Sequence, residues 1–118
     1  MKTYVVDGVT LVKGENAKEN FAIIDAARED DIWVHHRDLP SCHVVIACSA
    51  PSKEVLLAAG RLCCGAAKHA QHAQHATGKA NYVIWAPIRN VNKTKMMGMV
   101  TVDGATSLYV PRLDTKGE

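Results

Sequence analysis

Five side chains of the acid, base or metal-ligand type fall within thirteen residues of the sequence: Asp31, His35, His36, Asp38 and His43. Carboxylate and imidazole groups transfer protons in general acid–base catalysis, and both bind metal ions. Neighbouring side chains of a β-strand point to opposite faces, so His35 and His36 cannot both bind one metal ion unless the strand bends. If the chain is an enzyme, the predicted catalytic residues are Asp31, His35, Asp38 and His43.

The same segment also has an interpretation that requires no catalysis. Asp38 can cap the turn before Pro40, and one histidine can be a hydrogen-bonded residue of the core. Arg37 and His43 can hold phosphate through their N–H donors, without a metal ion or a general base. A binding surface and an active site are therefore both open interpretations of this segment.

A second group of histidines recurs at every third position, at His69, His72 and His75. Residues three apart are neighbours on a helix, which would allow a shared metal ion. However, this spacing drifts around the helix, and no carboxylate lies nearby to orient the rings. We expect a solvent-facing segment here, with metal binding as the alternative. The sequence has no glycine-rich nucleotide motif, and no cofactor is expected.

Basic side chains are concentrated in one part of the chain. The net charge is only +2, but residues 51–102 carry seven Lys or Arg against one Glu. Within them, the connector 89–95 has no acidic residue and carries Arg89, Lys93 and Lys95. A cationic segment without acids attracts phosphate, so the connector is predicted to contact a nucleic acid.

Apolar alternation predicts the elements that hold these side chains in the first half of the chain. Asp7-Gly8 is a favoured two-residue hairpin turn because these residues tolerate positive φ angles. A short helix follows, and its polar first turn carries Asn16, Lys18 and Asn20, which face either solvent or a ligand. The predicted elements are a hairpin over residues 4–12, this helix over 15–24, and strands over 32–34 and 44–46.

The second half predicts another helix and further strands. The helix begins near Pro51 and can continue to Ala76, and its small residues, among them Gly60, indicate close approach to a sheet. Asp103-Gly104 again favours a tight turn. The predicted strands are 81–85, followed by 99–102 and 107–110 as a second hairpin. The fold class is thus α+β, a mostly antiparallel sheet with N- and C-terminal β-hairpins and two helices packed on one side.

The chain is long enough for one domain, predicted over residues 1–113, with 114–118 as a frayed polar tail. It has no apolar run of the roughly 18 residues that span a bilayer, and no secretory signal. A cytoplasmic protein without a membrane partner is therefore expected. The four cysteines form no Cys-x-x-Cys pair and are expected to be free thiols.

Several motifs follow one another along the chain. Residues 14–20 read Gly-Glu-Asn-Ala-Lys-Glu-Asn, and residues 31–46 combine Asp-Ile-Trp-Val-His with Asp-Leu-Pro-Ser-Cys-His-Val. Shorter motifs lie at 91–93, 98–100 and 108–111. In this order they resemble the NFACT-R domain, the RNA-binding domain of the NEMF/RqcH ribosome quality-control family. That family's core motif is similar, with Asp-Ile-Trp-x-His followed by Asp-x-Pro-Gly-Ser-His-Val; here Ser-Cys replaces Gly-Ser.

The resemblance implies a stand-alone, single-domain RNA-binding module for tRNA or rRNA. Such a module would be accessory to ribosome quality control or RNA modification, and the ribosome or a protein partner would supply the missing family domains. The expected RNA-contacting residues are Asn16, Lys18, Asn20, His35, Arg37, His43, Arg89, Lys93 and Lys95. Two alternatives stay open: a metal- or histidine-dependent enzyme acting on RNA or nucleotides, and a protein-interaction adaptor.

Overall fold

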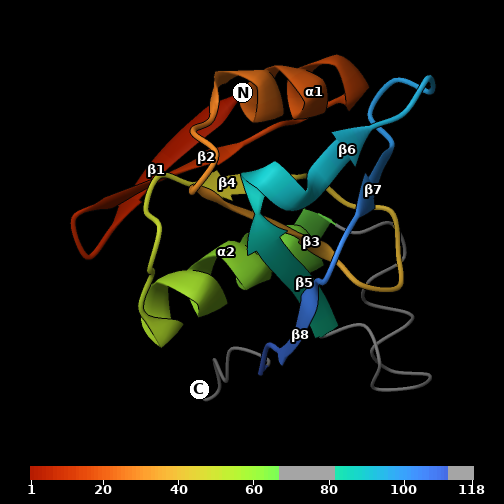
Figure 1. Ribbon diagram of the computed structural model, residues 1–118. Coiled ribbons are helices and arrows are strands. Elements are labelled where there is room, and N and C mark those ends of the chain that lie inside the picture. The colour runs from red at the N-terminus through yellow and green to blue at the C-terminus, as the bar shows by residue number, and fades with distance from the viewer. Residues whose placement is uncertain (67–81, 112–118) are drawn as a thin grey trace.

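The computed structural model describes residues 1–66 and 82–111 of the chain (Figure 1). The helices are α1 (Ala17–Ala26) and α2 (Lys53–Ala66), with a short 3-10 helix, η1 (Ile88–Asn90). The strands are β1 (Lys2–Val6), β2 (Val9–Lys13), β3 (Ile32–His36), β4 (Val44–Ile46), β5 (Tyr82–Pro87), β6 (Val91–Lys93), β7 (Val100–Val102) and β8 (Thr106–Tyr109).

The main sheet has six strands in the order β1-β2-β4-β3-β5-β8, and every neighbouring pair is antiparallel. β6 and β7 form a separate antiparallel pair. This arrangement confirms the α+β fold class and the predicted strands on either side of the histidine segment. The predicted extension of α2 to residue 76, the histidines at 69, 72 and 75, and the tail 114–118 lie outside the described residues.

The N-terminal hairpin is confirmed. β1 and β2 pair in register from Lys2↔Lys13 to Val6↔Val9, which leaves Asp7 and Gly8 as a two-residue turn. Their φ angles are 51° and 78°, as a type I′ turn requires. This turn allows β2 to return along β1 and to pair with β4 on its other side.

The helices cover opposite faces of the sheet, so the prediction that both lie on one side is wrong (Figure 1). On one face, α2 packs through Val55 and Cys63 in a cluster with Val34. On the other face, Ile23 of α1 packs in a cluster with Trp33. Adjacent residues of β3 thus enter different cores, because side chains alternate across a strand. A strand buried on both faces explains why each residue from 32 to 34 is apolar.

The prediction that residues 99–102 and 107–110 pair as a C-terminal hairpin is wrong, although both segments contain strands. β7 pairs with β6, and β8 pairs with β5 at the edge of the main sheet. The apolar side chains of β7 and β8 belong to different cores, because Val100 and Val102 pack on the α1 side and Leu108 on the α2 side. The Asp103-Gly104 turn, with Gly104 at φ 65°, therefore passes the chain from one layer to the other.

The close approach of α2 to the sheet is confirmed at Gly60. A Cβ atom there would lie 2.6 Å from Cγ2 of Val110 and 3.4 Å from Cγ2 of Val83. No larger residue fits without displacing the segment that follows β8. Among the described residues, no helix is long and apolar enough to cross a membrane.

Candidate functional site

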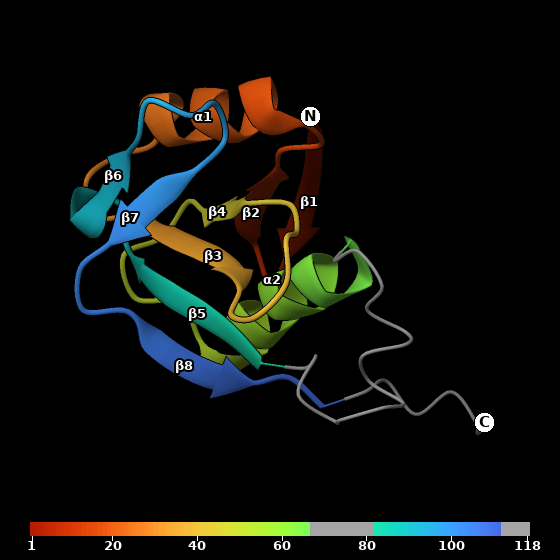
Figure 2. The ribbon, with the colours of Figure 1, turned by 90° about the vertical axis from the view of Figure 1, so that its right-hand side faces the viewer.

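A pocket of about 790 Å³, which we call the His35 pocket, lies beside β3 on the α1 side of the sheet. Its walls come from β3, the loop after β3, the start of α1 and the β6–β7 hairpin, which Figure 2 shows next to β3 and α1. Four residues predicted from the sequence to contact RNA line it: Asn20, His35, Arg37 and His43.

His43 lies at the base of this pocket and is fixed from several directions. The indole Nε1–H of Trp33 donates to Nδ1 of His43 over 3.0 Å. The backbone N–H of His43 donates to Oδ1 of Asn20 (3.2 Å), and its carbonyl accepts from the N–H of Gly14 (3.0 Å). Burial lowers the pKa of His43 from 6.5 to about 3, and the neighbouring His35 adds to this shift. A hydrogen bond with the backbone of Gly98 raises the pKa of His43 and so opposes the shift in part. His43 is therefore uncharged at neutral pH.

His35 presents an aromatic ring at the wall of the pocket. The ring stacks on Trp33, with 5.6 Å between centroids and 2° between planes, and meets His43 edge to face at 4.7 Å. Its Nδ1 lies 2.6 Å from the carbonyl oxygen of His36, so we assign the proton to Nδ1. Burial lowers the pKa of His35, although the carbonyl of His36 opposes the shift. Trp33, His35 and His43 thus form one uncharged cluster of rings.

His36 points to the opposite face, as the alternation of the strand predicted. Its Nδ1 accepts the N–H groups of Asp38 and Leu39, each over 2.9 Å. The expectation that Asp38 caps this turn is wrong, because the carboxylate of Asp38 pairs instead with Nε of Arg37 at 3.2 Å. A buried imidazole therefore holds the loop that forms one wall of the pocket.

Ser41 occupies the position where the family motif has glycine, and its side chain helps to fix the loop. Its hydroxyl oxygen accepts the N–H of His36 (3.1 Å), and the hydroxyl donates to the carbonyl of Cys42 (2.9 Å). Among the described residues, Asp7 is the non-glycine residue with positive φ, so the backbone at Ser41 is unstrained. The loop therefore closes without glycine.

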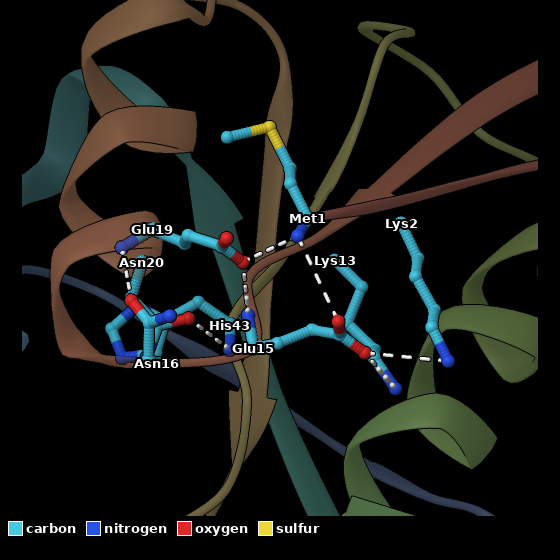
Figure 3. A network of polar contacts seen from close by, with 8 residues as sticks. All are labelled: Met1, Lys2, Lys13, Glu15, Asn16, Glu19, Asn20 and His43. Carbon is cyan, nitrogen blue, oxygen red and sulfur yellow. Dashed lines mark hydrogen bonds and ion pairs between the residues drawn. The ribbon is translucent and has the colours of Figure 1, made fainter.

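Asn16 and Asn20 organise the start of α1 (Figure 3). Oδ1 of Asn16 caps the helix by accepting the N–H of Glu19 at 2.9 Å. Asn20 is buried and holds the backbone of His43, and this contact requires glycine at position 14, since a Cβ there would lie 2.3 Å from Oδ1 of Asn20. The Asn-x-x-x-Asn pattern therefore joins α1 to the pocket, which the sequence alone did not reveal.

Arg37 is the cation at the rim of the pocket. Its guanidinium carbon lies 4.1 Å from the centroid of the Tyr82 ring, and its Nε pairs with Asp38. The side chain is about one-third exposed, so its free N–H groups can reach a ligand outside the protein. Lys18, on the exposed side of α1, makes no ion pair within the part of the chain that is described.

The basic connector has acidic partners on other elements, although its own sequence contains no acidic residue. Lys93 pairs with Asp25 of α1, and Arg89 pairs with Asp30 before β3. Arg89 does not line the His35 pocket but another one, beside Asp30. Lys95 is exposed and, among the described residues, has no acidic partner. The nine predicted residues therefore do not form one cluster.

Of the four residues predicted for catalysis, His35, Asp38 and His43 line the His35 pocket, and Asp31 lies apart from them. Asp31 accepts the N–H of Arg28 at 2.9 Å and lines the pocket beside Arg89, at the start of β3. His35 lies at the other end of the strand, roughly 13 Å away at about 3.3 Å per residue. Within residues 1–66 and 82–111, no group of three or more His, Cys, Asp or Glu could hold a metal ion.

One wall of the pocket, the turn between β6 and β7, was not predicted from the sequence. Met97, Gly98 and Met99 line the pocket there. Gly98 has φ 84°, and a Cβ atom on it would lie 2.8 Å from Cβ of Ala17. The lack of a side chain at Gly98 therefore allows the turn to lie against Ala17 of α1. In the sequence, the glycine between Met97 and Met99 was the signal that a turn lies at this position.

Comparison with known proteins agrees with this architecture. Residues 2–109 match the family described as NFACT protein RNA binding domain. The chain is 30% identical to the Rqc2 homolog RqcH of Bacillus subtilis over 98% of its own length, but spans only 20% of that relative. It also matches the solved C-terminal structure of the fibronectin/fibrinogen-binding protein from Streptococcus suis. There the TM-score is 0.76 at 28% identity, covering 95% of this chain and 45% of the other. The chain therefore belongs to the NFACT protein RNA binding domain family.

Proposed function

We propose that this protein binds RNA of the tRNA or rRNA class through the His35 pocket and its rim. The observation that carries the proposal is the uncharged ring cluster of Trp33, His35 and His43 in a pocket bordered by Arg37. RNA is commonly recognised at unpaired segments, where bases stack on aromatic side chains and arginine planes. Membership of an RNA-binding family supports the same conclusion.

The cations around the pocket suit the backbone of such a ligand. Arg37 lies at the rim, Lys18 on α1 and Lys95 on the β6–β7 hairpin, and all three have exposed side chains or ends. Each phosphate that a cation neutralises releases counterions, so affinity should fall steeply with salt. Lys93 is expected to contribute less than Lys95, because it already pairs with Asp25.

The test measures the affinity for a labelled tRNA and for an rRNA hairpin by fluorescence anisotropy across a salt series. Arg37→Ala should weaken binding roughly tenfold and reduce the salt slope by about 0.7. Lys95→Ala should have a smaller effect in the same direction. The matched control is Lys53→Ala, which removes an exposed cation at the start of α2, on the opposite face. Equal losses in Arg37→Ala and Lys53→Ala would show that binding does not use this surface.

A role in ribosome quality control is the specific form of this proposal. It is supported by the match to the Rqc2 homolog RqcH, of which the chain spans one-fifth. Sedimentation of the wild type and of Arg37→Ala with ribosomal subunits tests it, and only the wild type should co-sediment. Capture of a partner that survives nuclease treatment would instead support the protein-interaction adaptor.

A further inference from the structure

We propose that the His35 pocket holds a single unpaired nucleobase, covered by Met97 and Met99 of the β6–β7 turn. This inference rests on the proposed RNA binding and adds what enters the pocket. Its volume of about 790 Å³ lies within the range of small-molecule sites, roughly 300–1,000 Å³. A nucleobase with its sugar fits such a space, whereas a helical stem does not.

The chemistry of the lining separates the base from its phosphate. His35 and His43 are uncharged, and Ile84, Val100 and Val102 add apolar surface to the pocket. A phosphate in such surroundings would lose hydration without gaining a cation. Arg37 lies instead at the exposed rim of the pocket. The base therefore belongs inside, and the backbone belongs outside, beside Arg37.

Three exposed methionines lie within four residues of the β6–β7 turn. Met96, Met97 and Met99 are 64%, 59% and 53% exposed, among the largest values for apolar side chains in the described residues. Thioether sulfur packs favourably against aromatic rings, and methionine adapts its shape to irregular surfaces. A flat aromatic ligand in the pocket would cover Met97 and Met99, which line it, but not Met96, which does not.

The turn that carries these methionines is held in place rather than hanging free. The hydroxyl of Thr94 lies 2.9 Å from the carbonyl oxygen of Met99, and the N–H of Thr94 donates to the same carbonyl at 3.0 Å. Gly98 lies against Ala17 at the start of α1. The backbone of the turn is therefore held beside the pocket, so that little ordering of it is needed when a base enters.

The experiment compares two hairpin RNAs that differ at one loop position, which carries either 2-aminopurine or an abasic sugar. The RNA that carries 2-aminopurine, here called the intact RNA, should bind roughly tenfold more tightly than the abasic RNA. Its fluorescence should change as protein is added, until binding is saturated. Met97→Ala combined with Met99→Ala should weaken the intact RNA and leave the abasic RNA unchanged. Met96→Ala, in the same turn but outside the pocket, is the matched control and should behave as the wild type.

The possible results distinguish the two proposals. If abasic and intact RNA bind equally well, base insertion is wrong while RNA binding stands. Equal weakening of both RNAs by the double methionine variant would likewise overturn it, since the methionines would then contact another part of the RNA. If the wild-type protein binds neither RNA more tightly than the Arg37→Ala variant does, the proposed function itself fails.

Discussion

Single side chains decide the chemistry of the His35 pocket, and His43 shows this most clearly. The sequence predicted it as a donor to phosphate, whereas Nδ1 accepts the indole N–H of Trp33 and the ring is almost fully buried. His43 lines the His35 pocket. Its orientation depends on Trp33 and Asn20, ten and twenty-three residues away, which no local pattern connects.

The buried state of His43 predicts how stability depends on pH. Burial lowers its pKa from 6.5 to about 3, so the unfolded chain binds a proton that the folded chain excludes. The contribution of His43 to the free energy of unfolding is complete above about pH 6.5. It declines as the pH falls toward 3, by up to about 1.4 kcal/mol per pH unit. Urea unfolding between pH 7 and pH 4 should show a steeper loss in the wild type than in His43→Gln.

Parallel pH profiles for the two proteins would contradict this account of His43. The glutamine variant is a suitable comparison, because its amide oxygen can still accept the indole N–H of Trp33 and so preserve the contact. Surface carboxylates such as Glu19 titrate in both proteins and cancel in the difference between them.

At the level of elements, local signals located strands and turns but did not assign their partners. Residues 99–102 and 107–110 carry strand patterns around Asp103-Gly104, which predicted a hairpin. The chain instead separates them, because Val100 and Leu108 are buried in different cores. Pairing depends on which face a distant helix covers, and a sequence window of ten residues does not contain that information.

The contact of the β6–β7 hairpin with α1 predicts the effect of two glycine substitutions. Gly98→Ala should destabilise the fold by about 2 kcal/mol, because the new methyl group meets Ala17 and the residue has positive φ. Gly104→Ala has the same φ strain at 65° but no atom within 4 Å, so it should cost about 1 kcal/mol. Thermal unfolding of both variants measures the difference. A larger loss in Gly104→Ala would show that the turn does not rest on α1.

Across the whole molecule, the sheet separates two cores that contain different chemistry. The α2 core holds Cys42, Cys63 and Cys64, whereas Cys48 is only partly buried. The fold class could be predicted from the order of helices and strands. The two-sided burial could also have been predicted, since the apolar runs 32–34 and 44–46 do not alternate with polar residues.

This distribution predicts the order in which the thiols react. The described residues contain four free cysteines, of which three are buried. Burial raises the pKa of Cys63 and that of Cys64, the latter to about 11, so neither forms thiolate at neutral pH. Cys42 is shielded by burial, although its hydrogen bond with Cys63 lowers the pKa of its thiol. With an aromatic disulfide reagent, one thiol should react in the native protein and three more only in denaturant. Cys48→Ser should remove the fast reaction, and three rapid thiols in the native state would refute the packing of the α2 core.

The position of α2 on the face away from the His35 pocket gives the domain a natural point of attachment. Ser52 and Lys53, at the start of that helix, are exposed and lie across the sheet from the ring cluster. A dye, a bead or a fused protein joined there would leave the His35 pocket accessible. The domain can therefore be immobilised in one orientation, with its pocket directed toward the solution, to test whether it retrieves RNA.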